Sequence, residues 1–375
     1  MPALLPVHWP NMKTIADPQS GAAIAAAHWD QWQTRRAAQP SGPFTDFGDH
    51  PEVVGRVCEH LFGSKEISFI DFIRQQLPDL AQSHVLSLCC GDGTFECALV
   101  EQSVFGRVTG IDISPARVAV GNARIAASTM PGGQPLAERV QLRCADVNQA
   151  DYGQGLYDVV LAKSSLHHIE GLEHAFEQIR RCLKPGGRLV SIDFFGPTRF
   201  QWTETQLALR SWFWRQRVPA ELQRDDSGQP IPEIVRPSVQ AMLEMDPSEA
   251  VRSGELYALL QQHFELQSDL ALGGTLLNLL LYGDIVNRFD PDNPDHNAVI
   301  REAVDWERQL IAQGMLPSDF RLIIGQPRTQ TSKRFFARCN VTRLAAMFRP
   351  LPTERRAVCP SAAPAPPPSS AAPSC

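Results

Sequence analysis

The hydrophobic positions of residues 83–195 follow two alternating patterns. Short runs rich in valine, isoleucine and leucine predict buried strands, and between most of them apolar residues recur at helical spacing. Leu172, Phe176 and Ile179, for example, fall on one face of a predicted helix. Strands that alternate with helices favour an α/β fold, with a mostly parallel sheet and helices on both faces. The predicted strands are 84–88, 107–112, 140–144, 157–162 and 188–194.

The rest of the chain is expected to extend this core. Before it, a loop-rich stretch precedes two predicted helices, one starting at Pro51 and one over 67–77. After it, Asp246, Pro247 and Glu249 have the order of an N-cap, a first-turn proline and an N3 acid, which predicts a helix to about residue 262. We predict four parts: an N-terminal loop and helical cap (1–82), a ligand-binding core (83–195), a region of helical insertions (196–327), and a basic segment with a disordered Pro/Ala-rich tail (328–375). Within 196–327, predicted strands at 264–270 and 320–325 complete the sheet, and the helical insertions cover the substrate.

Composition and charge exclude several classes of protein. The chain has 375 residues, 43% of them hydrophobic, which is too apolar for a disordered protein and too long for a disulfide-stapled miniprotein. The net charge is −6; residues 330–375 contribute seven basic residues and one acid, so the remainder carries −12. An acidic body argues against a nucleic-acid substrate. The basic stretch from Lys333 to Arg349 is moderately amphipathic, which favours a helix packed on the body and also allows a weak contact with a membrane surface or a partner.

The cysteines and the longest apolar runs indicate a cytoplasmic protein. The nine cysteines form no C-x-x-C pair and no zinc-binding spacing, which predicts reduced thiols and no metal site. No stretch reaches the roughly 18 apolar residues of a membrane-spanning helix. The N-terminal residues lack the basic start and apolar run of an export signal.

Candidate ligand-binding residues follow the first three predicted strands. Gly91 and Gly93 come directly after the first strand, where they let a ligand approach the backbone. A dinucleotide fingerprint would have a third glycine where this chain has Glu96, which argues against NAD or FAD. Asp112 follows the second strand and can accept two hydrogen bonds from a ribose diol, while Asp146 follows the third and can accept the amine of an adenine. Together these residues predict a nucleoside pocket without a pyrophosphate.

The ordered motifs of 83–195 resemble those of the class I S-adenosylmethionine-dependent methyltransferases. They are HVLSLCCGDGTFE, GIDIS, CADV, YDVVLAKSSLHHI and LKPGGRLV, while FFGPTRFQWT, MDPSEAVRS and GGTLL further along look like a bacterial subgroup of the same family. The resemblance implies a Rossmann-like seven-stranded sheet with the last strand antiparallel, and S-adenosylmethionine as cofactor. It also implies that the cofactor contacts Cys89, Gly91, Asp92, Gly93, Asp112, Ile113, Asp146, Val147 and Lys163.

Two residues depart from the usual family pattern L-D-L-G-C-G-x-G. Ser87 stands in place of the first acid, and Cys89 in place of the first glycine. A side chain at position 89 is tolerated if the backbone is extended, but it is strained if φ is positive.

Three residues are candidates for the chemistry of methyl transfer. This reaction is an in-line displacement, and a general base is needed only when the acceptor is protonated at neutral pH. His167 and His168 follow the fourth strand, where an acceptor would meet the methyl group, and histidine titrates in the range that a base requires. Asp193, near the end of the fifth strand, is a third candidate.

The sequence therefore predicts a methyltransferase that acts on a small molecule. Methylation of a peptide or of a carrier-bound intermediate is an alternative, because a large aromatic-lined cover would accommodate either. A non-catalytic nucleoside-binding module is another, suggested by Cys89 and by the absence of an unmistakable base. A nucleotide-sugar or NAD enzyme is disfavoured by Glu96.

Overall fold

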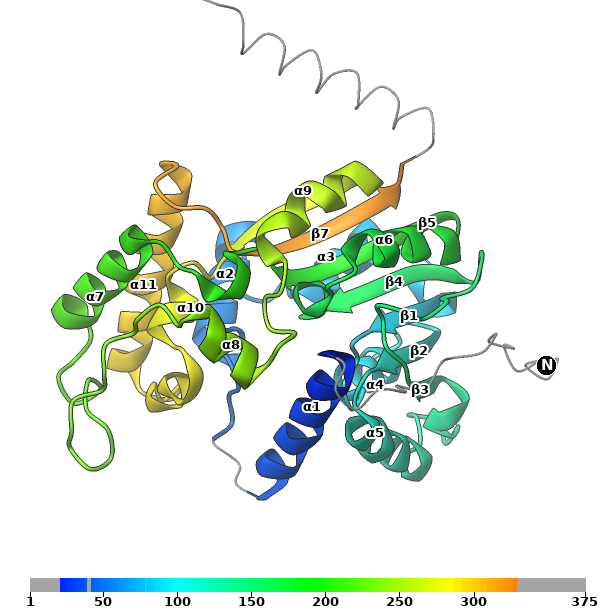
Figure 1. The fold of residues 1–375 in the computed structure, drawn as a ribbon, viewed down its shortest axis with the longest axis horizontal. Coiled ribbons are helices and arrows are strands. Elements are labelled where there is room, and N and C mark those ends of the chain that lie inside the picture. Colours follow the sequence, from blue (N-terminus) through cyan, green and yellow to red (C-terminus); the bar gives the residue numbers. More distant parts are fainter. Residues whose placement is uncertain (1–20, 39–41, 78, 329–375) are drawn as a thin grey trace, which may run out of the picture. The chain divides into compact units, whose positions relative to one another are not determined.

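A seven-stranded sheet forms the centre of the molecule (Figure 1). The structure is a computed structural model that describes residues 21–38, 42–77 and 79–328. The strand order is β3-β2-β1-β4-β5-β7-β6, and β7 is antiparallel to both of its neighbours. This confirms the predicted α/β fold and its antiparallel last strand. The strands are β1 (His84–Leu88), β2 (Arg107–Asp112), β3 (Val140–Cys144), β4 (Tyr157–Lys163), β5 (Leu183–Phe194), β6 (Phe264–Gly273) and β7 (Phe320–Pro327).

Helices cover both faces of the sheet, which explains why its inner strands β1, β2 and β4 are almost wholly buried. On one face, Leu86 and Leu88 of β1 belong to a core that includes α6 (Leu172–Cys182) and α9 (Ser253–His263). On the other face, Val85 belongs to a core that includes the remaining helices of this part of the chain. Those helices are α3 (Phe69–Gln76), α4 (Thr94–Glu101) and α5 (Pro115–Ala127).

A third apolar core joins α2 (Pro51–Phe62) to helices of the later insertions. It contains Phe213, Trp214 and the run of leucines after β6, so these apolar residues serve mainly in packing. In Figure 1 these helices lie together at one end of the sheet. They are α7 (Glu204–Arg217), α10 (Leu277–Leu280) and α11 (Pro294–Ala312); the insertions also contain α8 (Val239–Met245).

The helix predicted to begin at Asp246 is wrong at its start, since α9 begins at Ser253. The Asp246 carboxylate caps only a turn, accepting from the Ser248 amide at 2.8 Å. Ala250 then has φ = +48°, a left-handed conformation that cannot continue a helix. The residues 246–251 form a loop, and this loop lies beside the candidate site.

Several predictions concern parts of the chain outside the described residues. They are the tail within 328–375, of which only Arg328 is described, and the basic stretch 333–349. In the part that is described, all six cysteines are free thiols, and no helix is long and apolar enough to cross a bilayer.

Candidate functional site

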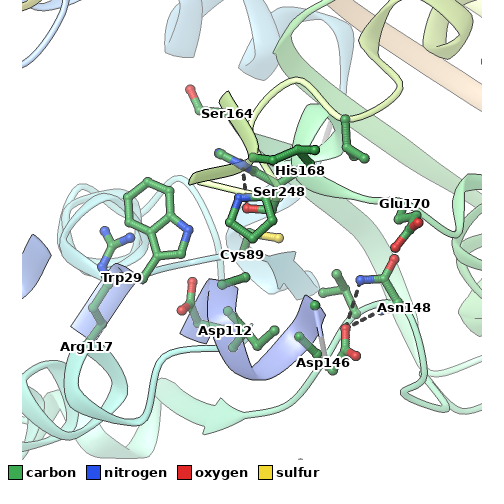
Figure 2. Close-up of a pocket in the computed structure, with 18 of the residues that line it drawn as sticks. Trp29, Cys89, Asp112, Arg117, Asp146, Asn148, Ser164, His168, Glu170 and Ser248 are labelled. Atoms are coloured by element: carbon green, nitrogen blue, oxygen red, sulfur yellow. Dashed lines mark hydrogen bonds between the residues drawn. The ribbon is translucent and has the colours of Figure 1, made fainter. Parts of the chain in front are cut away.

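A cavity of about 280 Å³ opens at the carboxyl ends of β1 to β4, where parallel sheets bind their ligands (Figure 2). Five of the predicted cofactor residues line it: Cys89, Asp112, Ile113, Asp146 and Val147. His168 and Ser248 line it as well, so the predicted nucleoside residues and one predicted catalytic residue share a single space.

The loop after β1 has the left-handed backbone that its glycines suggest. Gly91 and Gly93 have φ of +60° and +69°. A Cβ atom at Gly91 would lie 2.3 Å from the Arg117 guanidinium, and one at Gly93 would lie 2.8 Å from Leu142. The left-handed φ favours glycine at both positions, and any larger residue would also have to displace the side chain of Arg117 or Leu142.

The carboxylates of Asp112 and Asp146 are buried and held in fixed orientations. Asp112 accepts hydrogen bonds from the amides of Gly91 at 2.7 Å and Ser114 at 2.9 Å. Asp146 accepts from the amide and the side chain of Asn148, both at 2.9 Å (Figure 2). Each Asp112 oxygen accepts only one of these bonds, and the Oδ2 atom of Asp146 accepts only from the Gln149 side chain at 3.0 Å, so these three oxygens keep a lone pair for a ligand. The two acids are thus preorganised acceptors on the same cavity wall.

Helix α1 (Gly21–Ala38) covers the cavity, and sequence reasoning missed its role. Trp29 lines the cavity, and the Arg117 guanidinium lies 5.1 Å from the ring centres of both Trp29 and Trp32. Asp30 accepts hydrogen bonds from the Ser114 hydroxyl and from the Ala116 amide at the start of α5. The segment HWDQW, an acid flanked by aromatic residues in a helical stretch, is the signal that would have pointed to this contact.

His167 and Asp193 form a buried pair, with 2.6 Å between Nδ1 and Oδ1. Asp193 is only 1% exposed and also accepts from the amides of Ser165 and Leu166, so it fixes the loop that carries both histidines. The Nε2 atom of His167 lies 3.6 Å from Glu249. Although burial opposes a charge on the ring, these two carboxylates raise the pKa of His167 above its usual value.

Of the two histidines, His168 lines the cavity and His167 does not. Its Nδ1 lies 3.3 Å from the Ser248 hydroxyl, and its ring meets that of Trp29 edge-on at 5.4 Å (Figure 2). Burial and the neighbouring His167 lower the pKa of His168. The lowered pKa favours the neutral form of His168, in which one ring nitrogen can accept a proton.

A family model described as a methyltransferase domain matches residues 86–191, which contain most of β1, all of β2 to β4, most of β5 and the loops after β1 to β4 that line the cavity. Residues 86–191 therefore form a class I S-adenosylmethionine-dependent methyltransferase domain. It is 28% identical over 134 residues to a demethylmenaquinone methyltransferase of Lactiplantibacillus plantarum, covering 34% of this chain and 54% of that protein. It is 33% identical over 124 residues to the 27-O-demethylrifamycin SV methyltransferase of Amycolatopsis mediterranei, covering 33% and 43%.

The chain thus spans about half the length of the curated relatives it matches. Among solved structures, it resembles the geranyl diphosphate C-methyltransferase of Streptomyces coelicolor A3(2). That likeness covers 84% of this chain and all of the other, with 15% identity and a TM-score of 0.47.

Four predicted cofactor residues are not among those that line the cavity: Gly91, Asp92, Gly93 and Lys163. The two glycines shape the loop from behind. Asp92 accepts from Thr94 at the start of α4 and pairs with Arg124 at 3.4 Å. The Lys163 ammonium lies 5.3 Å from the ring centre of Phe95. Within this structure, these two side chains act in the packing around the loop.

Ser87, the first departure from the methyltransferase pattern, is explained by a buried partner on α4. The Ser87 hydroxyl donates to the carboxyl group of Glu96 at 2.6 Å. Glu96 is 3% exposed, and burial raises its pKa. The acid that usually stands on the strand is thus replaced by one that reaches back from the helix, at the position where a dinucleotide fingerprint has glycine.

Three side chains around the two histidines lie close enough together to hold a metal ion. One ligand atom from each of His167, His168 and Glu249 lies within 4.8 Å of the others. The closeness of these groups is explained without a metal ion, because His167 lies between the carboxylates of Asp193 and Glu249 and can pair with both. We assign no metal to the cluster, and the expectation that the chain holds none stays a prediction.

Cys89 adopts the strained form of the loop, with φ = +49°. We expect Cys89→Gly to be more stable than Cys89→Ala by about 1 kcal/mol, because both lose the thiol but only glycine relieves the left-handed strain. Urea unfolding of the two variants measures this difference. The matched pair is Cys97→Gly and Cys97→Ala within α4, where alanine should be the more stable by about 1 kcal/mol. If alanine is also better at position 89, the loop is not strained there.

Proposed function

We propose that this protein transfers the methyl group of S-adenosylmethionine to a small-molecule acceptor. The observation that carries the proposal is the shared cavity, in which two preorganised carboxylates and a neutral histidine face one space. When bound, S-adenosylmethionine supplies an electrophilic methyl group. Asp112 would hold the ribose hydroxyls and Asp146 the adenine amine, with Ile113 and Val147 beside the base.

The acceptor side of the cavity carries the groups for proton removal. We propose His168 as the base that takes a proton from an acceptor hydroxyl. His167 is proposed as a positioning residue, since it is held by Asp193 and lies against His168 with 4.1 Å between ring centres. Burial and, after it, the neighbouring His167 lower the pKa of His168, which favours the neutral form that a base requires.

The acceptor class rests on a coarser argument. The matched relatives are named for demethylmenaquinone and 27-O-demethylrifamycin SV, which are small molecules. The cavity is about 280 Å³ and is covered by α1, which supports a small acceptor over a folded protein substrate. A peptide or a carrier-bound molecule is the second candidate, favoured by the aromatic residue Trp29 that lines the cavity.

Binding and turnover are tested separately. S-adenosylmethionine and S-adenosylhomocysteine should raise the melting temperature of the protein, and NAD should not. Release of S-adenosylhomocysteine in the presence of a panel of hydroxylated small molecules then measures turnover. Stabilisation by NAD would contradict the cofactor assignment. Stabilisation by S-adenosylmethionine without turnover of any acceptor would indicate the nucleoside-binding module instead.

The attachment of α1 is expected to control access to the cavity. Asp30→Ala removes the cap that α1 gives to α5, which should weaken the attachment of α1 by about 1 kcal/mol. Hydrogen exchange of the backbone amides in α1 should then become about five-fold faster. Gln31→Ala, an exposed position on the same helix, is the control and should leave exchange unchanged. Equal exchange in both variants would mean that Asp30 does not hold the helix.

A further inference from the structure

Arg199 lines the cavity and carries a cation that the protein does not neutralise directly. Its guanidinium makes a hydrogen bond to the backbone carbonyl of Glu249 at 3.1 Å. Within the described ranges, no carboxylate lies within 4 Å of the guanidinium in an ion pair with it. A planar guanidinium has five donors in a fixed fork, so most of its donors remain for a ligand.

The backbone holds Arg199 in place at a conformational cost. Arg199 has φ = +54° and the next residue, Phe200, has φ = +52°. Left-handed backbone costs about 1–2 kcal/mol at each such residue, and it persists where the surroundings enforce it. Here the Arg199 amide donates to the carbonyl of Ala250 at 2.8 Å, and Ala250 is itself left-handed. Strained residues of this kind cluster at ligand sites.

The loop 246–251 connects Arg199 to the proposed base. Two backbone carbonyls of this loop accept hydrogen bonds from Arg199: that of Ala250 from the amide and that of Glu249 from the guanidinium. The same loop offers Ser248 to His168, and its Val251 amide donates to the carbonyl of His167 at 3.0 Å. Arg199 is thus fixed to the acceptor side of the cavity, whereas Asp112 and Asp146 belong to the nucleoside side.

Nearby acids keep Arg199 charged without occupying it. Burial lowers the pKa of Arg199, and Asp246, Glu170 and Glu249 oppose that effect. Two of these acids already have partners, since Asp246 accepts from Ser248 and Glu249 lies against His167. The remaining one, Glu170, lines the cavity and is exposed to solvent.

We infer that the acceptor carries an anionic oxygen group, a carboxylate or a phosphate, which Arg199 binds while the hydroxyl to be methylated faces His168. The inference rests on the proposed function and narrows its substrate class. A guanidinium fork pairs with either anion through two parallel hydrogen bonds. A neutral acceptor of the same size would leave this cation partly buried and without a carboxylate in direct contact.

The test compares matched probes on the protein loaded with S-adenosylhomocysteine. The probes are 4-hydroxybenzoate against 4-hydroxybenzamide and glucose 6-phosphate against glucose, which separate a carboxylate from a phosphate. We expect the wild type to bind at least one anionic probe about ten-fold more tightly than its neutral partner, as measured by calorimetry or ligand-observed NMR. Arg199→Gln should remove this preference. Arg199→Lys, which keeps the charge but loses the fork, should retain part of it.

Two controls keep the result interpretable. Arg215→Gln removes an exposed arginine that pairs with Glu233 and should leave the preference unchanged. Affinity for S-adenosylhomocysteine should stay within about two-fold in all variants. If Arg199→Gln changes this affinity, the preference for the anionic probe is judged on Arg199→Lys instead.

The inference is overturned if the loaded wild type binds no anionic probe, if both members of each pair bind equally, or if Arg199→Gln keeps the preference. Wild-type protein that fails to bind S-adenosylhomocysteine would instead overturn the proposed function. Methylation of neutral acceptors only would leave the proposed function standing and reject the anionic acceptor.

Discussion

Asp112→Ala is expected to abolish stabilisation by S-adenosylhomocysteine and to weaken its binding by about 100-fold. A carboxylate that accepts two hydrogen bonds from a ribose diol contributes about 3 kcal/mol in all. The variant also frees the Gly91 amide, which Asp112 accepts at 2.7 Å, so the glycine loop loses the contact that orients it. Calorimetry with S-adenosylhomocysteine and the shift in melting temperature measure the two consequences.

Asp158→Ala provides a matched control at the opposite end of the sheet. The Asp158 carboxylate also accepts a backbone amide, that of His84 at 2.8 Å, and it pairs with Lys184. Its removal should lower stability but leave affinity for S-adenosylhomocysteine unchanged. Asp112→Asn should fall between the two, because an amide retains one acceptor oxygen. If Asp112→Ala binds the ligand as the wild type does, the ribose assignment is wrong.

The sheet could be predicted from the sequence because its strands are buried on both faces. The runs at 84–88, 107–112 and 140–144 have the same bounds in the structure as in the prediction. The fifth strand starts earlier than expected, at Leu183, because Leu183 already pairs with Tyr157 of β4, before a register shift that precedes the pairing of Arg188 with Val159. The carboxyl ends of parallel strands meet at one edge of the sheet, so the strand pattern alone predicts that Asp112 and Asp146 share one cavity.

Long-range contacts could not be predicted in the same way. Asp246 and Glu249 have the spacing of a helix start, yet hydrogen bonds from Arg199 and to His167 hold them in a loop. The sequence pattern of a cap is local, whereas these bonds join residues about 50 and 80 positions apart. Asp30 shows the same limit, since its partners Ser114 and Ala116 lie on a helix that its own segment does not specify.

The two histidines illustrate what only the structure could separate. The motif makes both His167 and His168 candidates for the base, because they are adjacent and follow the same strand. The short helical turn that carries them directs His167 toward Asp193 and His168 into the cavity. Their pKa values shift in opposite directions for that reason.

His168→Ala is expected to lower kcat/KM by at least about 100-fold with a hydroxyl acceptor, since removal of a general base typically has effects of 100-fold to 10,000-fold. Affinity for S-adenosylhomocysteine should change little, because the nucleoside groups lie on the other wall of the cavity. His174→Ala on α6, whose ring contacts the carbonyl of Ala150 at 3.4 Å, is the control. A small effect of His168→Ala on kcat/KM would exclude His168 as the base.

The pH profile distinguishes a base from a merely structural histidine. Because the pKa of His168 is lowered, the wild type should keep its full rate at pH 7 and lose it only as the pH falls below about 6.5. The charge of His167 contributes to that lowering, so His167→Gln should raise the pKa of His168 and move the acidic decline in kcat/KM to higher pH. Asp193→Asn should lower kcat/KM, because it releases the loop that places His168. A profile that does not move in His167→Gln would mean that the two rings titrate independently and that His167 does not tune the base.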